Sequence, residues 1–460
     1  MKLLASLLCC IAAICSSASL RAQSVLFRSD TANHVFYRIP ALLSHGKSLL
    51  LFTDDRSGVT DATAWGDIGS IGNISIVARR SKNCGRTWLP DVQTAIEGKG
   101  CSGFDTGHGD AAVVCDRASG RMLLMCASGT VSYGRSSVSV TDGGNGSYSL
   151  DLSNAQKVGR YYSSDGGRTW KGADVTPEIY SIYNSPSAET VGTNNVPVTR
   201  LFFASGRICQ SSVIKHGDYH RIYSVLTTNR GSLVVYSDDF GGRWNPLGGA
   251  DAQPAPNGDE AKIEELPDGS VLLSCRMMGG RYFNIFSYSD TASASGEWAE
   301  PVASTALDGG TATQNNACNG EILIVPARDS KGNMVYVALQ STPFGSSEQL
   351  PTNVDRRCNV SIYWKVLSTA ADFARPACFT SGWTRFEITN TRSAYSTMVV
   401  DANGNIAFAY EDNGVVMRLG SQNADIYDIV FRTLTLKEIT GGEYTYSRAK
   451  KHRQAFLKRR

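Results

Sequence analysis

Residues 163–170 read SSDGGRTW, and altered versions of this stretch recur along the chain. SKNCGRTW stands at residues 81–88 and SDDFGGRW at residues 237–244, while SDTASASGEW at residues 289–298 is a more distant version. In such a pattern the Asp can accept hydrogen bonds from backbone N–H groups of its own loop, the Gly allows a positive φ, and the Trp can pack between sheets. The pattern predicts a hairpin turn that recurs for structural rather than catalytic reasons.

A longer repeat surrounds these turns and consists of a Gly-containing turn, a short apolar strand and a polar residue. Its six copies are HGKSLLLFTDDR (45–56), DRASGRMLLMCAS (116–128), NNVPVTRLFFASGR (194–207), LPDGSVLLSCR (266–276), DSKGNMVYVALQ (329–340) and DANGNIAFAYED (401–412). Their strands start 64 to 79 residues apart, a period typical of one β-propeller blade per repeat. We therefore predict an all-β, six-bladed β-propeller that forms a single domain over residues 23–446. Two β-sandwiches are the alternative, but six near-even copies argue against them.

The composition agrees with many short strands joined by tight turns. Of the 460 residues 42% are hydrophobic, 19% are charged and 45 are glycine. This apolar content supports a packed core and excludes disordered, collagen-like and coiled-coil chains. Beyond the first 20 residues, no segment is apolar enough to span a membrane.

The two ends of the chain differ from its body. Residues 1–22 contain Lys2, an apolar run and then small residues, a pattern that predicts a signal peptide cleaved near Ala22 and a secreted or periplasmic protein. Residues 447–460 hold seven Lys or Arg and no acid, which predicts a solvated basic tail. Without both ends the net charge changes from +3 to −6, so the body gives no support to nucleic-acid binding.

The sequence points to no metal site and no cofactor. The nine cysteines after residue 22 include no CxxC pair, and the histidines offer only the weak pair His216 and His220. An odd number of cysteines predicts at least one free thiol. The motifs GxSxG, GxxxxGKS/T and HExxH are also missing.

Polar residues end several of the repeated strands. These ends are TDDR (53–56), SGR (205–207), SCR (274–276) and AYED (409–412). Because corresponding strand ends of a propeller gather at one mouth of its channel, we expect Arg56, Arg276 and Glu411 to lie close together. One such arginine alone would more readily be a salt bridge at a blade edge. Arginines that converge favour a planar anionic ligand, since a guanidinium group binds a carboxylate through two hydrogen bonds.

These strand ends, taken with YRIP (37–40), RRCNV (356–360) and AYST (394–397), resemble the exo-α-sialidases, or neuraminidases, of the bacterial type with RIP and Asp-box motifs. The resemblance extends from about residue 25 to about residue 435. An Asp box alone is weak, but the ordered set of RIP, Asp boxes, Glu–Arg pair, third Arg and late Tyr is specific. The resemblance implies a cofactor-free enzyme that removes terminal α-linked sialic acid from glycoproteins, glycolipids and oligosaccharides, so sialylated glycoconjugates are the expected partners.

The resemblance also implies that Arg38, Arg276 and Arg357 bind the carboxylate of sialic acid. Three cations around one carboxylate repel one another, and Glu411 is similar to the buried glutamate that holds the first arginine. Arg356 is the alternative to Arg357. We prefer Arg357 because it stands two residues before the Asn-Val that opens the next strand, and its neighbour would face the opposite side.

Tyr395 resembles the nucleophile of the family, and Glu260 resembles its partner base. A carboxylate nucleophile would be repelled by the sialic acid carboxylate on the anomeric carbon. A neutral phenol that loses its proton to Glu260 during attack avoids this repulsion, and sialidases are a known exception to the two-carboxylate rule of glycosidases. Without the motif, Tyr395 would be an ordinary strand aromatic and Glu260 part of a solvated acidic turn.

Asp61 resembles the general acid/base, which needs a mobile loop that substrate can cover; Asp67 is its rival. Asp110 resembles the aspartate that holds polar substituents of the sugar. Arg56 looks like a contact on the carboxylate side or to the 4-hydroxyl group. Two other functions stay open: a trans-sialidase that passes the sugar to an acceptor galactose, and a catalytically silent propeller that binds sialic acid.

Overall fold

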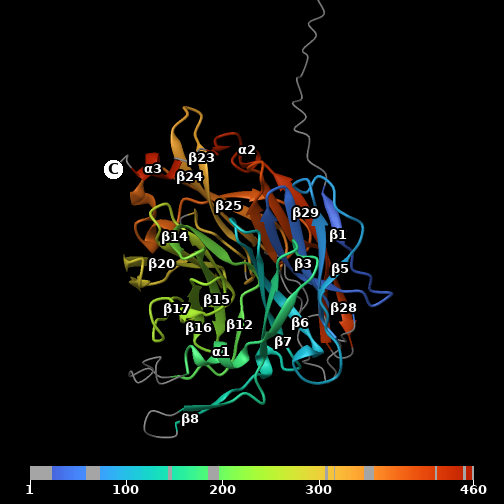
Figure 1. The fold of residues 1–460 in the computed structure, drawn as a ribbon. Coiled ribbons are helices and arrows are strands. Elements are labelled where there is room, and N and C mark those ends of the chain that lie inside the picture. The colour runs from blue at the N-terminus through green and yellow to red at the C-terminus, as the bar shows by residue number, and fades with distance from the viewer. Residues whose placement is uncertain are drawn as a thin grey trace, which may run out of the picture.

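The computed structural model describes residues 23–57, 73–142, 148–184, 196–305, 309–314, 316–346, 357–419, 422–448 and 452–457. Strands make up about half of this part of the chain, and helices only a small share (Figure 1). They form five larger sheets and one separate hairpin, and all pairs but β13–β6 are antiparallel. The predicted all-β class is confirmed.

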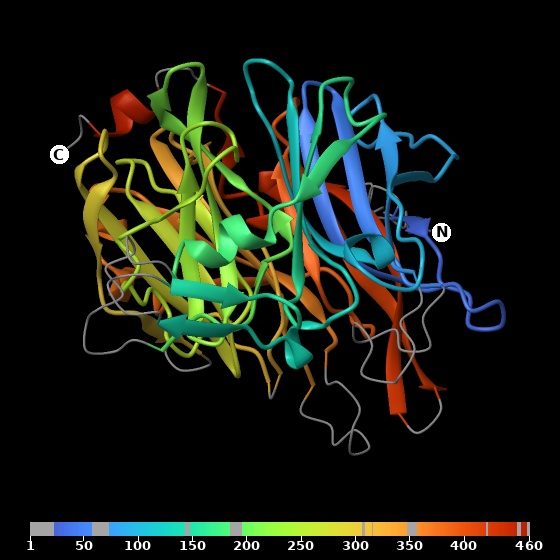
Figure 2. The same cartoon turned by 60° about the horizontal axis from the view of Figure 1, so that its bottom comes forward.

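The eight-stranded sheet joins the two ends of the chain. Its order is β27 (Ser396–Val400), β28 (Ile406–Leu419), β29 (Gln422–Leu434), β2 (Tyr37–His45), β3 (Ser48–Asp55), β4 (Ser75–Ser81) and β5 (Gln93–Ile96), with β1 (Ser24–Phe27) beside β29. One residue pair, Tyr37 opposite Tyr427, links β2 to β29. Early strands, in blue, therefore lie beside late strands, in red (Figures 1 and 2).

The other four sheets have five strands each and are named here after a central strand. The β7 sheet contains β11 (Lys171–Asp174), β10 (Lys157–Ser163), β7 (Met122–Ser128), β6 (His108–Cys115) and β13 (Gly206–Arg207). The β15 sheet contains β12 (Leu201–Phe203), β15 (Tyr219–Thr228), β16 (Gly231–Ser237), β17 (Asn245–Pro246) and β14 (Cys209–His216). The β19 sheet contains β18 (Ala261–Glu265), β19 (Val271–Met277), β20 (Gly280–Asp290), β21 (Ser295–Trp298) and β22 (Val302–Ser304). The β24 sheet contains β26 (Thr384–Glu387), β25 (Val360–Leu367), β24 (Met334–Pro343), β23 (Ile322–Arg328) and β30 (Thr445–Tyr446).

The remaining described elements are small. The separate hairpin is β8 (Ser139–Asp142) with β9 (Tyr148–Asp151). The helices are α1 (Thr176–Ser181), α2 (Leu436–Ile439) and α3 (His452–Leu457), and the 3-10 turns are Phe104–Thr106, Tyr133–Arg135, Ala370–Phe373 and Pro376–Phe379. None of the helices in the described ranges has the length and apolar character needed to cross a membrane.

The recurring turn connects outer strands of a sheet, as its residues predict. In SSDGGRTW the Asp165 carboxylate accepts the backbone N–H groups of Arg168 and Thr169 at 2.9 and 3.0 Å. Gly167 has φ +81°, and a Cβ there would lie 2.5 Å from a Leu50 methyl carbon. Trp170 packs edge-on against Phe52 of β3, with ring centroids 5.8 Å apart. The turn thus holds neighbouring sheets together.

Five of the six longer repeats occupy equivalent positions, but the copy at 194–207 does not. The five equivalent strands (β3, β7, β19, β24 and β28) each pair on both sides. The third copy instead supplies β12, which pairs only with β15. The equivalent strand of that sheet is β15, whose turn HGD (216–218) was not counted as a repeat.

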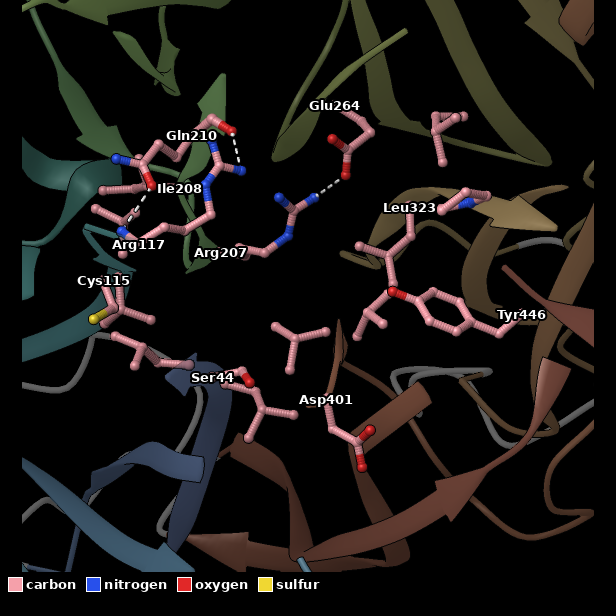
Figure 3. Close-up of a pocket in the computed structure, with 18 residues that line it drawn as sticks. Ser44, Cys115, Arg117, Arg207, Ile208, Gln210, Glu264, Leu323, Asp401 and Tyr446 are labelled. Carbon is pink, nitrogen blue, oxygen red and sulfur yellow. Dashed lines mark hydrogen bonds and ion pairs between the residues drawn. The ribbon is translucent and has the colours of Figure 1, made fainter. Parts of the chain in front are cut away.

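One cavity of about 440 Å³, the rear cavity, is lined by residues from all five larger sheets (Figure 3). Six of the strands that line it, called the inner strands here, are β2, β6, β13, β18, β23 and β27. In β2, β6, β18 and β27 the lining residues stand toward the C-terminal end of the strand. The N-terminal ends of these strands therefore meet away from the rear cavity, at what is called the mouth end below.

The basic C-terminal segment is not simply solvated, contrary to the prediction from its composition. The His452 ring lies 2.9 Å from the Val335 carbonyl oxygen, and Phe456 is buried against Tyr336. Arg453 donates to the Ser212 hydroxyl at 3.0 Å. An apolar side chain and a histidine within the basic run thus anchor α3 to the sheets.

Candidate active site

The mouth end collects side chains from strands that are distant in sequence. Arg38 and Asp110 stand near the starts of β2 and β6, and Glu260 and Tyr395 directly precede β18 and β27. Each neighbouring strand runs antiparallel to its inner strand, so its C-terminal end reaches the same place. In this way Arg56, Arg276 and Glu411 join the group. The Arg56 side chain is bonded to Asp54, which lies opposite Arg38.

The other two are tied to the inner strands by backbone hydrogen bonds. The Arg276 N–H donates to the Glu260 carbonyl and the Glu411 N–H to the Tyr395 carbonyl, both at 2.9 Å. The predicted convergence of Arg56, Arg276 and Glu411 is confirmed.

Tyr395 and Glu260 form a direct hydrogen bond in the buried interior of this group. The Tyr395 hydroxyl donates to Glu260 Oε2 at 2.7 Å. Arg276 Nη1 donates to the same oxygen at 2.5 Å and lies 3.1 Å from the Tyr395 hydroxyl oxygen. One phenol, one carboxylate and one guanidinium therefore share a single contact point, although they are separated by up to 135 residues.

The charges around this pair keep the proton on the phenol and the negative charge on the acid. Burial, and next the Glu260 carboxylate, raise the pKa of Tyr395 well above its usual value. Burial alone would raise the pKa of Glu260, but the Arg276 cation and the hydrogen bond from Tyr395 outweigh it, and the pKa lies below the ordinary value. The arrangement is a protonated phenol beside an ionised carboxylate.

Glu411 holds Arg38 and the backbone of Tyr395 at the same time. Its Oε1 accepts Arg38 Nε at 2.7 Å and the Ile39 N–H at 2.8 Å. Its Oε2 accepts Arg38 Nη2 at 3.3 Å and the Tyr395 N–H at 3.1 Å. Glu411 is fully buried. Its carboxylate accepts these four hydrogen bonds and thereby fixes Arg38 relative to Tyr395.

Arg357 also lies over the ring of Tyr395. Its guanidinium carbon is 5.2 Å from the centre of the Tyr395 ring, and that of Arg38 is 5.5 Å away. Arg357 Nε donates to the Ala317 carbonyl oxygen at 3.2 Å. Two guanidinium groups therefore lie over the phenol ring and a third, that of Arg276, contacts its hydroxyl, an arrangement that suits a ligand with a carboxylate. Arg356, the alternative to Arg357, lies outside the described residues.

Arg56 and Asp110 meet through a third residue, Asp54. Arg56 donates to Asp54 Oδ2 through Nη2 at 2.7 Å and Nε at 3.2 Å, and the Asp110 N–H donates to Asp54 Oδ1 at 3.0 Å. Asp110 has φ +55° and lies at a bulge of β6, which turns it away from the regular ladder. Burial, followed by the Asp54 carboxylate, raises the pKa of Asp110 to about 7.

Two further residues of the site were not predicted from the sequence. Asp54 belongs to the quoted motif TDDR, and its place opposite Arg38 follows only from the strand pairing. Asp259 Oδ2 lies 3.3 Å from Arg276 Nε, and its adjacency to Glu260 was the available signal. Asp61 and its rival Asp67 lie outside the described residues.

Within the described ranges, no cluster of three or more His, Cys, Asp or Glu side chains could hold a metal ion.

The rear cavity lies at the opposite end of the inner strands. On β18 it is lined by Glu264, four residues after Glu260, and on β2 by Leu42, Leu43 and Ser44, beyond Arg38. Figure 3 shows Arg207 at its centre, paired with Glu264 at 2.7 Å. Arg207 ends the repeat copy at residues 194–207, whose strand does not take the position that the other five copies take in their sheets. This arginine is therefore not at the mouth end.

The comparisons with known proteins agree on the fold. No protein-family model matches the sequence, and no curated protein matches it in sequence. The leech intramolecular trans-sialidase has a similar structure, with a TM-score of 0.63 and 14% identity over 91% of this chain and 70% of that one. The intramolecular trans-sialidase from Ruminococcus gnavus gives 0.61 and 15% over 91% of this chain and 98% of that one. The Trypanosoma rangeli sialidase gives 0.56 and 14% over 91% of this chain and 60% of that one. The chain therefore has a sialidase-like fold.

Proposed function

We propose that this protein is a retaining exo-α-sialidase that hydrolyses terminal α-linked sialic acid from glycoproteins, glycolipids and oligosaccharides. The observation that carries the proposal is the 2.7 Å hydrogen bond from the Tyr395 hydroxyl to the Glu260 carboxylate, with Arg38, Arg276 and Arg357 around it. A buried phenol that donates to an ionised acid is a nucleophile with its base in place. Three arginines at that phenol supply the charge that a substrate carboxylate requires.

In the first step the Tyr395 oxygen attacks the anomeric carbon, and the bond from that carbon to the leaving oxygen breaks. The phenol proton moves to Glu260, which explains why the pKa of this acid must stay low before the attack. The departing oxygen takes a proton from Asp61, or from its rival Asp67. The product of this step is a tyrosyl-sialosyl enzyme.

In the second step water attacks the anomeric carbon from the face that the aglycone has left. The general acid, now ionised, removes the water proton, and the bond to the Tyr395 oxygen breaks. Glu260 returns its proton to the phenol. Two displacements at one carbon leave its configuration unchanged, so the sialic acid is released in the α form.

The arginines act in both steps through the substrate carboxylate. Glu411 keeps Arg38 in position, and Arg276 contacts both Glu260 and Tyr395. Arg56 and Asp110 face polar substituents of the sugar in this proposal. Protonated Asp110 can donate a hydrogen bond, while ionised Asp110 can only accept one.

The proposal extends to the architecture and the destination of the chain. We assign the five larger sheets to a six-bladed β-propeller, in which the eight-stranded sheet comprises two blades joined at Tyr37 and Tyr427. Residues 1–22 act as a signal peptide in this proposal, so the mature protein is secreted or periplasmic. N-terminal sequencing of exported protein should start close to Gln23; an unprocessed Met1 would contradict the assignment.

Release of 4-methylumbelliferone from its α-sialoside, followed over pH 4 to 8, tests the activity. Product analysis by NMR should show free α-sialic acid as the first product. With 3′-sialyllactose as donor and added lactose as acceptor, transfer to lactose would instead identify a trans-sialidase. A 2,7-anhydro product would identify an intramolecular one. Binding of sialic acid without any release would identify a catalytically silent sialic-acid-binding protein.

A further inference from the structure

A layer of buried charge lies directly beneath the mouth end. On β18 the side chains of Glu260, Lys262 and Glu264 point to one face because alternate residues of a strand share a face. The face is covered by the β24 sheet, since Ser274, opposite Lys262 on β19, donates to Gln340 of β24 at 2.5 Å. Lys262 is thus one layer below Glu260, in the interior between two sheets.

Lys262 is a buried cation without a close acidic partner. Its side chain is 2% exposed, and its Nζ has no hydrogen-bond partner among the described residues. A Cβ at Gly206 would lie 2.7 Å from this Nζ, so the backbone of β13 approaches the ammonium group closely. Among the described residues, no carboxylate oxygen lies within 4.0 Å of Lys262 Nζ, the limit for an ion pair.

Arg281 is a second such cation in the same layer. It is fully buried on β20, where it stands opposite Arg276 of β19. Its guanidinium donates to Ser274 Oγ at 3.1 Å, to the Ser274 carbonyl at 3.0 Å and to the Cys318 carbonyl at 2.8 Å. All three acceptors are neutral, so the positive charge of Arg281 is solvated by dipoles but is not cancelled by a described carboxylate.

The acids of this interior are mostly engaged elsewhere. Glu264 pairs with Arg207 at 2.7 Å, and Glu321 lies 3.7 Å from the same guanidinium and accepts the Thr397 hydroxyl at 3.2 Å. Glu321 and Glu260 are the carboxylates that act electrostatically on Lys262. Buried cations without a paired acid are costly to the fold. Two such cations beneath Glu260 create a field that favours the ionised form of this acid.

We propose that Lys262 and Arg281 are positioning residues that keep Glu260 ionised and thereby set the acid limit of the reaction. This inference rests on the proposed function, in which Glu260 must be free of its proton to accept that of Tyr395. Along a strand, residues two apart are separated by roughly 7 Å. At that distance a buried cation lowers the pKa of a carboxyl group by an amount on the order of one unit.

The other charged and titratable groups that face Glu260 are known. Arg276, Arg357 and Tyr395 favour its ionised form, whereas the carboxylates of Asp259 and Asp110 oppose it. Arg276 and Arg357 are expected to bind the substrate carboxylate, which cancels part of their effect on Glu260. Lys262 and Arg281 lie behind the site, where substrate cannot neutralise them, so their contribution persists in the complex.

The test compares Lys262→Met with Arg281→Lys. The first removes a charge at nearly constant volume, and the second keeps a charge but loses hydrogen bonds. We expect Lys262→Met to move the acid limb of the kcat/KM profile upward by about 1 pH unit. Arg281→Lys should lower the melting temperature but leave the limb in place. Lys365→Met is the matched control, because this half-buried lysine of β25 donates instead to the Ser381 carbonyl oxygen.

A double-mutant cycle in thermal stability supplies a readout that does not depend on activity. Lys262→Met and Glu260→Gln should be non-additive at pH 7, where Glu260 is ionised, and nearly additive at acid pH, where it is protonated. Additive effects at pH 7 together with an unmoved limb would overturn the inference. Coupling without any release of sialic acid would uphold the charged layer and refute the proposed function instead.

Discussion

The two ends of the inner strands hold similar residues in different arrangements. At the mouth end Glu260, Tyr395 and Arg276 share one contact point. At the other end Glu264, Tyr446 and Arg207 line the rear cavity, where Arg207 is paired with Glu264. The hollow of about 440 Å³ is thus at the end where the described residues form no phenol–carboxylate hydrogen bond. The comparison teaches that the two ends differ in whether a phenol, a carboxylate and a guanidinium share one contact, and that cavity volume does not report this difference.

The sharpest way to break this comparison is to remove one phenol oxygen at each end. Tyr395→Phe should lower kcat/KM for 4-methylumbelliferyl-α-sialic acid by roughly 1,000-fold or more, because the nucleophile is lost. Tyr446→Phe should stay within about twofold, since the rear cavity takes no part in the reaction. Equal losses in the two variants would mean that the rear cavity contributes to the activity.

The second comparison uses two glutamates of one strand. Glu260→Gln should lower kcat by roughly 100- to 1,000-fold, because the amide cannot accept the phenol proton. Glu264→Gln should mainly lower the melting temperature, because it leaves Arg207 with a weaker partner in a buried place. Steady-state kinetics and thermal melts of both variants measure the two effects. A kinetic defect in Glu264→Gln at intact stability would contradict the division.

The third comparison replaces one arginine at each end. Arg276→Met should lower kcat/KM by roughly 100-fold and raise KM, because the contact with the substrate carboxylate exists in ground and transition states. Arg207→Met should leave KM within about twofold, since this guanidinium contacts Glu264, Glu321 and the Ile322 carbonyl oxygen at the rear cavity. Isothermal titration with a sialic acid analogue provides the affinities. Unchanged affinity in Arg276→Met would remove this arginine from the binding site.

The smallest expected effect concerns the crowding of acids at the mouth end. Asp110, with a pKa of about 7, holds a proton in the folded state that the unfolded chain has already lost. Stability therefore falls as the pH rises toward and through 7. Asp110→Asn should lack this loss of stability. The difference between its melting temperature and that of wild type should therefore be roughly 2 °C more favourable to the variant at pH 8 than at pH 5.

Asp165→Asn is the control for that titration. Hydrogen bonds from Thr169 lower the pKa of Asp165, so this carboxylate is ionised at both pH values. Its difference from wild type should be the same at pH 5 and pH 8. The same pH trend in both variants would assign the effect to the whole protein rather than to the mouth end.

Much of the architecture could be predicted because the repeats combine turn chemistry with strand patterns. SSDGGRTW forms the turn that its Asp and Gly residues require, and five of the six repeated strands take equivalent places. The copy at 194–207 misled because VTRLFF is the more apolar stretch, whereas the equivalent strand β15 carries Ser and Thr. Hydrophobicity reports burial, but it does not report which position a strand takes in its sheet.

The site could be predicted where a motif carried it, and not where pairing created it. Glu260, Tyr395 and Glu411 lie together as the resemblance implied. Asp54 became part of the site through its position opposite Arg38, and Lys262 through its place below Glu260. Such relations depend on strand register and on the contacts between sheets, which a single sequence does not display.

Labelling with 2,3-difluorosialic acid tests the central claim most directly, because this compound forms the covalent intermediate observed with the Trypanosoma rangeli sialidase. Wild-type protein should gain the mass of one 3-fluorosialosyl group, because the fluoride on the anomeric carbon leaves as the bond to oxygen forms, and peptide mapping should place this group on Tyr395. Tyr395→Phe should remain unlabelled, while Tyr446→Phe should label as wild type does. Label on any other residue, or an unlabelled wild type that still releases sialic acid, would contradict the account.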